Sequence, residues 1–170
     1  MDLSAVAPFG QIGWAEGRKG IVILDQTGLP SAVPMLQLES IEAIEEAIKS
    51  LRVRGAPLIG ITGAMGLAAL ASQAASDGIS IARLRELGTA WAARLSSARP
   101  TAVNLKWAVG RMRTVFEQPA FDAAGLADAL VDEADQILSE DAGMCRAIGE
   151  HGVGLLEDSS IVLTHCKAKT

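Results

Sequence analysis

Three residues that suit phosphate binding, Arg52, Arg54 and Gly55, stand immediately before a long apolar stretch that begins at Ala56. The first N–H groups of a helix have no partner within the helix and carry partial positive charge, so a helix that begins here would attract an anion. Glycine lets a ligand approach the backbone, and an arginine guanidinium can hold two phosphate oxygens at once. The alternative is a solvated arginine pair with a glycine that ends the preceding helix.

A second arginine stands in the same position before another expected helix. Arg99, Pro100 and Thr101 form this turn, and Asn104 follows one helical turn later. The alternative here is a helix start capped by Thr101 beside an exposed arginine. Two such turns at one helical core would together suit a phosphorylated small molecule held between them.

A thiol follows a short β-branched run near the end of the sequence. Residues 160–163 (SIVL) favour a strand, and His165 and Cys166 come directly after it. In open α/β sheets the ligand crevice lies beyond the carboxyl ends of the strands, so Cys166 would be placed for acid–base or nucleophilic chemistry. The alternative is a buried cysteine that acts as a small hydrophobe. We expect His165 to be structural or to support a neighbouring group.

Other residues that could bind a metal or a cofactor do not form a recognisable pattern. Cys145, His151, His165 and Cys166 are of metal-ligating types, but their spacing is not that of a zinc site. The Gly152-Val153-Gly154 segment resembles the start of a dinucleotide loop, yet it precedes the expected strand. We therefore expect neither a metal nor a cofactor.

Composition limits the class of protein. The chain has 170 residues, of which 49% are hydrophobic and 21% charged, which is typical of a folded domain. Aromatic residues are 4% and there are 17 glycines, so we expect a core of closely packed aliphatic helices. A net charge of -5 argues against nucleic acid or acidic lipid as a partner. Two cysteines form no disulfide framework and there is no signal-peptide pattern, so we expect a cytoplasmic protein.

Hydrophobic patterning predicts a small β element followed by helices. Two apolar runs, residues 21–25 and 33–38, flank turn residues and predict a hairpin, with Pro34 placing the second strand at an edge. Helical spacing then begins after Ser40 and resumes from about Pro57, Ser80 and Thr101. A final helix carries apolar residues up to Met144 and Ile148, and Gly152 and Gly154 end it.

The apolar stretch 56–71 could be mistaken for a membrane span. It is uncharged but falls short of the roughly 20 residues that a span needs. Gly60, Ala64 and Ala68 recur every four residues, which lets a neighbouring backbone come close. We therefore predict a buried helix and no membrane association.

Three segments together resemble the N-terminal signature segments of methylthioribose-1-phosphate isomerases. They are residues 52–71 (RVRGAPLIGITGAMGLAALA), 98–108 (ARPTAVNLKWA) and 161–166 (IVLTHC), in the family's order. The superfamily includes ribose-1,5-bisphosphate isomerase and the regulatory subunits of translation initiation factor 2B. The hairpin residues around Leu24-Asp25-Gln26 and Leu29-Pro30 also fit.

The resemblance implies a mainly α fold with a small N-terminal β element. Residues 1–150 would be a β-hairpin plus helical-bundle domain, the N-terminal domain of a two-domain α/β protein. Residues 151–170 would begin a Rossmann-like catalytic domain that is truncated after its first strand.

The implied activity is aldose–ketose isomerisation of 5-methylthioribose 1-phosphate to 5-methylthioribulose 1-phosphate in methionine salvage. By the same resemblance, Arg54, Gly55, Ala56 and Arg99 would bind the sugar phosphate. Cys166 matches the catalytic cysteine that moves a proton between C1 and C2, while an Asp of the second domain assists ring opening. The apolar helix surfaces are compatible with a homodimer.

The sequence departs from the family after Cys166. The family continues with Asn and a Gly/Ala-rich loop, whereas this sequence reads Lys167-Ala168-Lys169-Thr170. We therefore expect the chain to be inactive alone. One alternative is a non-catalytic regulatory module of the translation-factor branch that binds a phosphosugar, although such a module has no need of the thiol. Another is an inert remnant that folds only alongside a partner chain.

Overall fold

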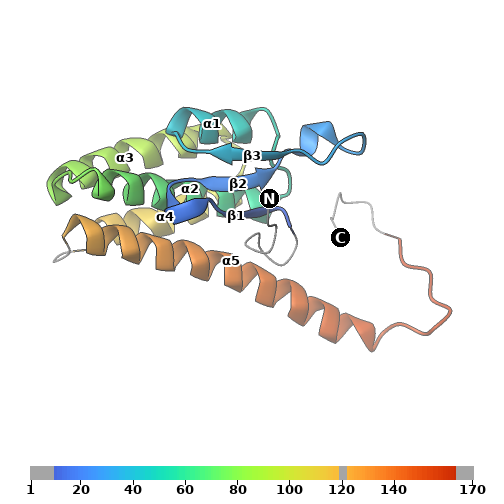
Figure 1. Cartoon of the computed structure of the whole chain (residues 1–170). Helices are drawn as coiled ribbons and strands as arrows, with labels where there is room; N and C mark the ends of the chain where they lie inside the picture. Colours follow the sequence, from blue (N-terminus) through green and yellow to red (C-terminus); the bar gives the residue numbers. More distant parts are fainter. Residues whose placement is uncertain (1–9, 119–121, 164–170) are drawn as a thin grey trace.

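The computed structural model describes residues 10–118 and 122–163, which form a helical bundle with a small sheet on one side (Figure 1). Its three strands pair antiparallel in the order β1-β2-β3. They are β1 (Ile12–Trp14), β2 (Ile21–Leu24) and β3 (Met35–Leu38). The predicted hairpin is confirmed as β2 and β3, and β3, which follows Pro34, lies at the edge as predicted. The three-residue strand β1 is additional.

Five helices follow the sheet, close to the positions that the patterning predicts. They are α1 (Ile41–Lys49), α2 (Ala56–Ser76), α3 (Ile81–Ala98), α4 (Val103–Phe116) and α5 (Ala123–Val153). A mainly α fold with a small N-terminal β element is therefore confirmed.

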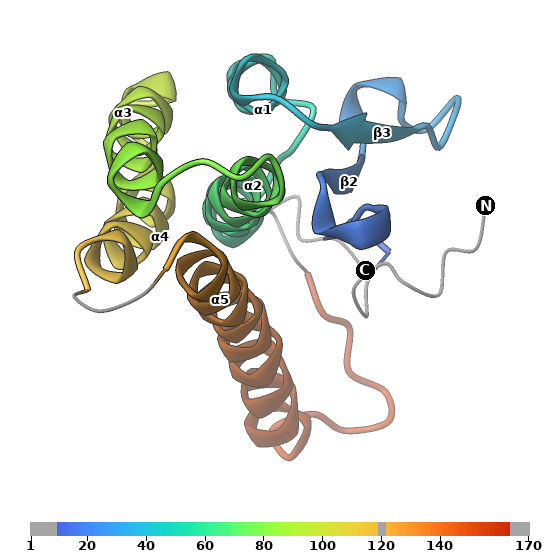
Figure 2. The same cartoon turned by 60° about the vertical axis from the view of Figure 1, so that its left-hand side comes forward.

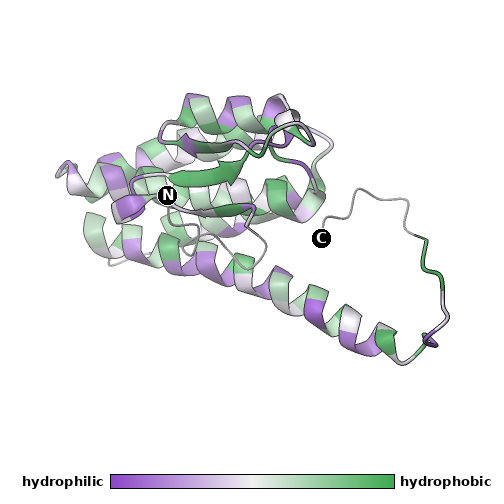
Figure 3. Ribbon diagram, turned by 45° about the vertical axis from the view of Figure 1, so that its right-hand side comes forward, coloured by the Kyte–Doolittle hydropathy of each residue, from purple (hydrophilic) through white to green (hydrophobic). Residues whose placement is uncertain are grey.

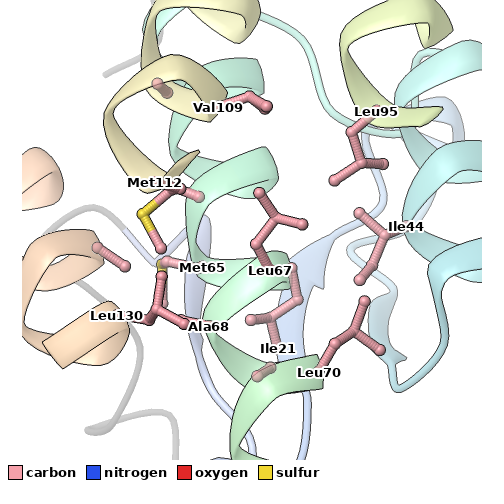
Figure 4. Packing of buried hydrophobic residues seen from close by; sticks show 14 of the residues in the cluster. Ile21, Ile44, Met65, Leu67, Ala68, Leu70, Leu95, Val109, Met112 and Leu130 are labelled. Carbon is pink, nitrogen blue, oxygen red and sulfur yellow. The ribbon is translucent and has the colours of Figure 1, made fainter. Parts of the chain in front are cut away.

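Helix α2 is the centre of the domain. The other helices and the sheet surround it (Figure 2), and its buried residues Met65, Leu67 and Ala68 lie in the middle of the core (Figure 4). Within the described part of the chain it is the one helix long and apolar enough to cross a membrane. However, 78% of its most apolar window is buried inside the domain. The prediction of a buried core helix is confirmed.

Glycine allows α2 and α4 to pack at very short range. A Cβ atom added at Gly60 would lie 2.7 Å from the backbone oxygen of Asn104, and one at Gly63 would lie 2.6 Å from Leu105. Real Cβ atoms do not approach a backbone atom so closely, so the contact at Gly60 requires glycine. At Gly63 the near atom is Cδ1, the end of the Leu105 side chain, which can shift. Gly60 also lies against Ala108, and Gly63 against Val109. Both helices therefore run in the same direction, and their N-terminal ends lie together.

Helix α5 is longer than the bundle that it packs on. Its first half buries Leu126, Leu130 and Ile137, whereas Met144 and Ile148, expected on the same apolar face, are exposed. Figures 1 and 2 show this second half extending away from the other helices.

The expected strand at residues 160–163 is not formed. This segment is irregular, and the side chains of Ile161 and Leu163 are 98% and 94% exposed. A strand needs a neighbour to satisfy its backbone groups, and the three described strands pair only with one another. Helix α5 also continues to Val153, three residues past the expected division at 150/151, which stays a prediction.

The short α2–α4 contact gives a first prediction. Gly60→Ala should lower the free energy of unfolding by about 2 kcal/mol, because its methyl group must push the α4 backbone away. Gly110→Ala in α4 is the matched control: nothing lies within 4 Å of its added Cβ. That change should stabilise the protein by about 0.5–1 kcal/mol through helix propensity. Urea unfolding measures both, and equal effects of the two substitutions would contradict the packing argument.

Candidate functional site

The N-terminal ends of α2 and α4 differ from those of the other helices. Ser40, Ser80 and Asp122 cap α1, α3 and α5, each accepting a backbone N–H through its side chain. At α2 and α4 the preceding residues are Gly55 and Ala102, and no side chain caps either helix. Because these two ends lie together, their uncapped N–H groups and partial positive charges point to one region.

The turn before α2 requires glycine. Gly55 has φ of +101°, in the left-handed region that residues with a side chain rarely adopt. Gly55 and Ala56 are both exposed, so a ligand can reach the backbone here. The predicted role of these two residues at an anion site is compatible with this geometry.

The turn before α4 departs from the sequence-based expectation. Thr101 was expected to cap α4, but the N-cap position is Ala102, whose N–H donates to the oxygen of Arg99 at 2.9 Å. The tight turn at residues 99–102 moves the helix start one residue beyond Thr101, whose side chain therefore makes no cap. The first N–H groups of α4 are thus left without a side-chain cap.

The two arginines predicted to bind phosphate, Arg54 and Arg99, are both half-buried beside these ends. Arg54 Nε donates to the oxygen of Leu51 at 3.2 Å, which fixes its side chain against the turn. Across residues 10–118 and 122–163, neither arginine forms an ion pair with an acidic side chain. Each therefore keeps guanidinium N–H groups for an anion.

Arg52, the third arginine considered for phosphate, has a structural role. Its Nη1 lies 2.5 Å from Asp25 Oδ2, and its Nε lies 2.8 Å from Glu46 Oε2. Its backbone oxygen accepts the N–H of Gln26 at 2.9 Å. Two carboxylates occupy the guanidinium, so Arg52 joins the β2–β3 connection to the turn that carries Arg54 and Gly55.

Asp25 is the buried partner in this network. Its Oδ1 accepts the backbone N–H of Thr27 at 2.9 Å and the Thr27 hydroxyl at 2.6 Å. Burial alone would raise the pKa of Asp25, but the hydrogen bonds from Thr27 and the pairing with Arg52 outweigh it and lower this pKa. The ionised carboxylate is therefore the form that the fold stabilises.

A cleft of about 140 Å³ opens beside the two helix ends, between α2, α4 and α5. Its walls include Pro57, Gly60, Asn104 and Trp107, and Asp141 lies on the α5 side. Burial raises the pKa of Asp141. The sequence analysis did not single out this cleft, because it requires knowing that α5 packs across the first turns of α2 and α4.

The thiol expected to do the chemistry, Cys166, and its neighbour His165 lie outside the described residues. Cys145 is exposed on the second half of α5, and so is His151. In the described part of the chain no three His, Cys, Asp or Glu side chains cluster as metal ligands would. The described site is thus an arrangement of backbone N–H groups and two arginines whose chemistry suits an anion.

Comparison with known proteins gives consistent matches. The chain matches the Initiation factor 2 subunit family over residues 52–170. It is 44% identical over 157 residues to the methylthioribose-1-phosphate isomerase of Gemmatimonas aurantiaca, covering 92% of this chain and 44% of that protein. It is also 44% identical over 165 residues to the 5-deoxyribose 1-phosphate isomerase of Moorella thermoacetica, covering 96% and 46%. The chain spans about half the length of the curated relatives it matches.

Two solved structures share the fold. The delta subunit of translation initiation factor eIF-2B from A. fulgidus is 33% identical, with a TM-score of 0.82 over 93% of this chain and 45% of that one. The 5-methylthioribose 1-phosphate isomerase of Pyrococcus horikoshii OT3 is 27% identical, with a TM-score of 0.78 over 92% and 44%.

The Asp25 network gives a second prediction. Asp25→Asn should lower the free energy of unfolding at pH 7 by about 2 kcal/mol, because Arg52 and Thr27 lose a charged acceptor. The pKa of Asp25 is lowered by folding from 3.8, so its stabilisation exists above that pH and is lost as the pH falls through the folded value. Urea unfolding should therefore separate wild type and variant most at pH 7, and the separation should shrink as the pH falls below 3.8.

Asp132→Asn on the exposed face of α5 is the control and should have little effect at either pH. A difference between wild type and Asp25→Asn that stays constant from pH 7 to pH 3 would contradict the assignment.

Proposed function

The chain belongs to the initiation factor 2 subunit family, and within that family we propose that it is the N-terminal, phosphate-binding part of a sugar-phosphate isomerase. The substrate would be 5-methylthioribose 1-phosphate and the product 5-methylthioribulose 1-phosphate, as the name of the Gemmatimonas aurantiaca relative suggests. In this proposal the protein would act in methionine salvage, in the cytoplasm.

One observation carries this proposal: the two helix ends without side-chain caps lie together, and each follows an arginine without an acidic partner in the described structure. A phosphate would accept hydrogen bonds from the N–H groups at Gly55 and Ala56. Arg54 and Arg99 would supply bidentate contacts and offset its charge. Arg52 is held by Asp25 and Glu46, so it would position this turn without touching the ligand.

The proposed reaction explains why a thiol is needed. Phosphate on C1 prevents the sugar from opening its ring as a free aldose does. An acid must therefore assist the ring oxygen while a base removes a proton at C2. Cys166 would serve as the proton carrier between C2 and C1. The isomerisation is internally balanced, so it consumes no oxidant or reductant.

A second candidate function is a regulatory module that binds a phosphosugar without turnover. The observation that favours it is the match to the A. fulgidus initiation factor subunit, with a TM-score of 0.82 and 33% identity. Both candidates use the phosphate site, but only the isomerase needs the thiol of Cys166.

Calorimetry of the 170-residue chain with 5-methylthioribose 1-phosphate tests the phosphate site. Arg54→Ala and Arg99→Ala should each weaken binding by about tenfold or more, since each removes a charged hydrogen bond worth about 1.5–3 kcal/mol. Arg83→Ala is the control, because Arg83 is exposed and paired only with Glu86 among the described acidic residues. An unchanged affinity in the Arg99→Ala variant would show that the assignment is wrong.

An isomerase assay separates the two candidate functions. We expect no turnover from the 170-residue chain alone, and turnover from a chimera that continues with the C-terminal half of the Gemmatimonas aurantiaca relative. Cys166→Ser in the chimera should abolish turnover by at least about a hundredfold while leaving sugar-phosphate affinity within about threefold. Binding without turnover in the unsubstituted chimera would favour the regulatory module.

A further inference from the structure

The cleft between α2, α4 and α5 begins where the proposed phosphate site ends. Pro57 in its wall follows Ala56 directly, and Asn104 is the second residue of α4. Ile61 in the same wall lies five residues beyond Ala56, or about 7.5 Å along the helix axis at 1.5 Å per residue. A ligand whose phosphate lies at the two helix ends can therefore extend into this cleft.

Most of the cleft wall is apolar. Trp107 and Met144 lie at its mouth, where they are 52% and 58% exposed. The guanidinium of Arg111 lies 5.1 Å from the Trp107 ring centre, and Arg111 is paired with Glu133 and Glu140, so the ring is held in place. An apolar group that enters the cleft would leave water for these side chains. The apolar wall residues are Pro57, Ile61, Trp107, Ile137 and Met144.

Two polar side chains in the same cleft, Asn104 on α4 and Asp141 on α5, form no hydrogen bond or ion pair within residues 10–118 and 122–163. Asp141 is half-buried, and its pKa is raised because burial disfavours the charged carboxylate. Figure 3 shows hydrophobic and hydrophilic positions side by side along this part of α5. A purely apolar occupant would leave both polar groups without hydrogen bonds, whereas hydroxyl groups would satisfy them.

The size of the cleft limits the occupant further. Its volume of about 140 Å³ is smaller than the roughly 300–1,000 Å³ of pockets that enclose a whole ligand. It therefore suits one end of a small molecule whose other end lies outside. That end must carry an apolar group and lie close to hydroxyl groups.

A ribose 1-phosphate without a hydroxyl at C5 has this combination. The ring oxygen and C4 separate C5 from the phosphate-bearing C1, so the two ends of the sugar reach different parts of the site. The Pyrococcus horikoshii isomerase is named for 5-methylthioribose 1-phosphate, and the Moorella thermoacetica relative for 5-deoxyribose 1-phosphate. In both names a methylthio group or a hydrogen replaces the C5 hydroxyl.

We propose that the cleft is the subsite for the C5 end of the sugar, and that it selects ribose 1-phosphates with an apolar C5 substituent over those with a C5 hydroxyl. The substituent packs against Trp107 and Met144, and a thioether sulfur gains from contact with the aromatic ring. Asn104 donates to the sugar hydroxyls, and Asp141 accepts from them. The inference rests on the proposed function in placing the phosphate at the ends of α2 and α4.

Calorimetry of the 170-residue chain with three probes tests the subsite. The probes are 5-methylthioribose 1-phosphate, 5-deoxyribose 1-phosphate and ribose 1-phosphate. Wild type should bind the methylthio compound at least about tenfold more tightly than ribose 1-phosphate, because the methylthio group leaves water for the apolar wall. The affinity for 5-deoxyribose 1-phosphate should lie between the two.

Trp107→Ala and Met144→Ala should each reduce this preference to about threefold or less, with little change in the affinity for ribose 1-phosphate. Ile148→Ala is the matched control, because Ile148 lies one turn beyond Met144 on α5, is 68% exposed and is outside the cleft wall. It should keep the full preference. Urea unfolding checks that each variant folds, and if Trp107→Ala does not, Met144→Ala decides.

Asp141→Ala tests the polar side of the cleft. It should weaken binding of all three probes by a similar factor of about five or more, because each probe loses the same hydroxyl acceptor. The preference for the methylthio compound should remain. A loss confined to one probe would contradict the role given to Asp141.

Two results would overturn the subsite and leave the phosphate site in place. One is equal affinity for the three probes, or tighter binding of ribose 1-phosphate, that Arg99→Ala abolishes. The other is a preference that Trp107→Ala and Met144→Ala both retain, or that Ile148→Ala also loses. Unchanged affinities in Arg99→Ala, with a preference that still depends on Trp107, would overturn the phosphate site alone. Binding of none of the three probes would overturn both.

Discussion

The close approach of α4 to α2 is the contact on which the rest of the structure depends. Gly60 has no side chain to separate the two helices, so the Asn104 backbone can lie directly against α2. This fixes the two helices in parallel and sets their N-terminal ends together. The proposed anion site therefore depends on packing inside the core, several residues away from the arginines that would touch a ligand.

Ion pairing elsewhere in the domain explains why particular arginines remain for a ligand. Arg94 bridges α3 to Glu42 and Glu45 of α1, and Arg111 bridges α4 to α5. Arg52 is likewise occupied by two carboxylates. Arg54 and Arg99 stand at the helix ends outside these described networks. Both lie beside unpaired helix N–H groups, and this combination suits an anion. Composition and net charge do not indicate it.

Local patterns in the sequence were enough to predict most of the fold. Helical spacing that begins after Ser40 and again from Ser80 predicted α1 and α3, whose first residues are Ile41 and Ile81. The predictions that were wrong concern residues whose role depends on segments that the local sequence does not include. Thr101 has the right side chain for a cap, but the turn at Arg99 displaces it. Arg52 resembles a ligand-binding residue until Asp25, far away in sequence, is placed beside it. The apolar segment at 161–163 satisfies strand propensity but has no strand beside it in the described structure.

The 31 residues of α5 form a continuous rod, about 46 Å long at 1.5 Å per residue. The first half of α5 packs against α2, whereas its second half is exposed. A small rotation of the first half therefore moves the second half as a rigid body. A tilt of about 10° where α5 leaves the bundle would move its far end by about 4 Å, given the same rise per residue over half of the helix. Small changes in core side chains at the α2–α5 contact would therefore be magnified in the position of whatever follows Val153. The packing of α2 against α5 thus determines where the residues after Val153 lie.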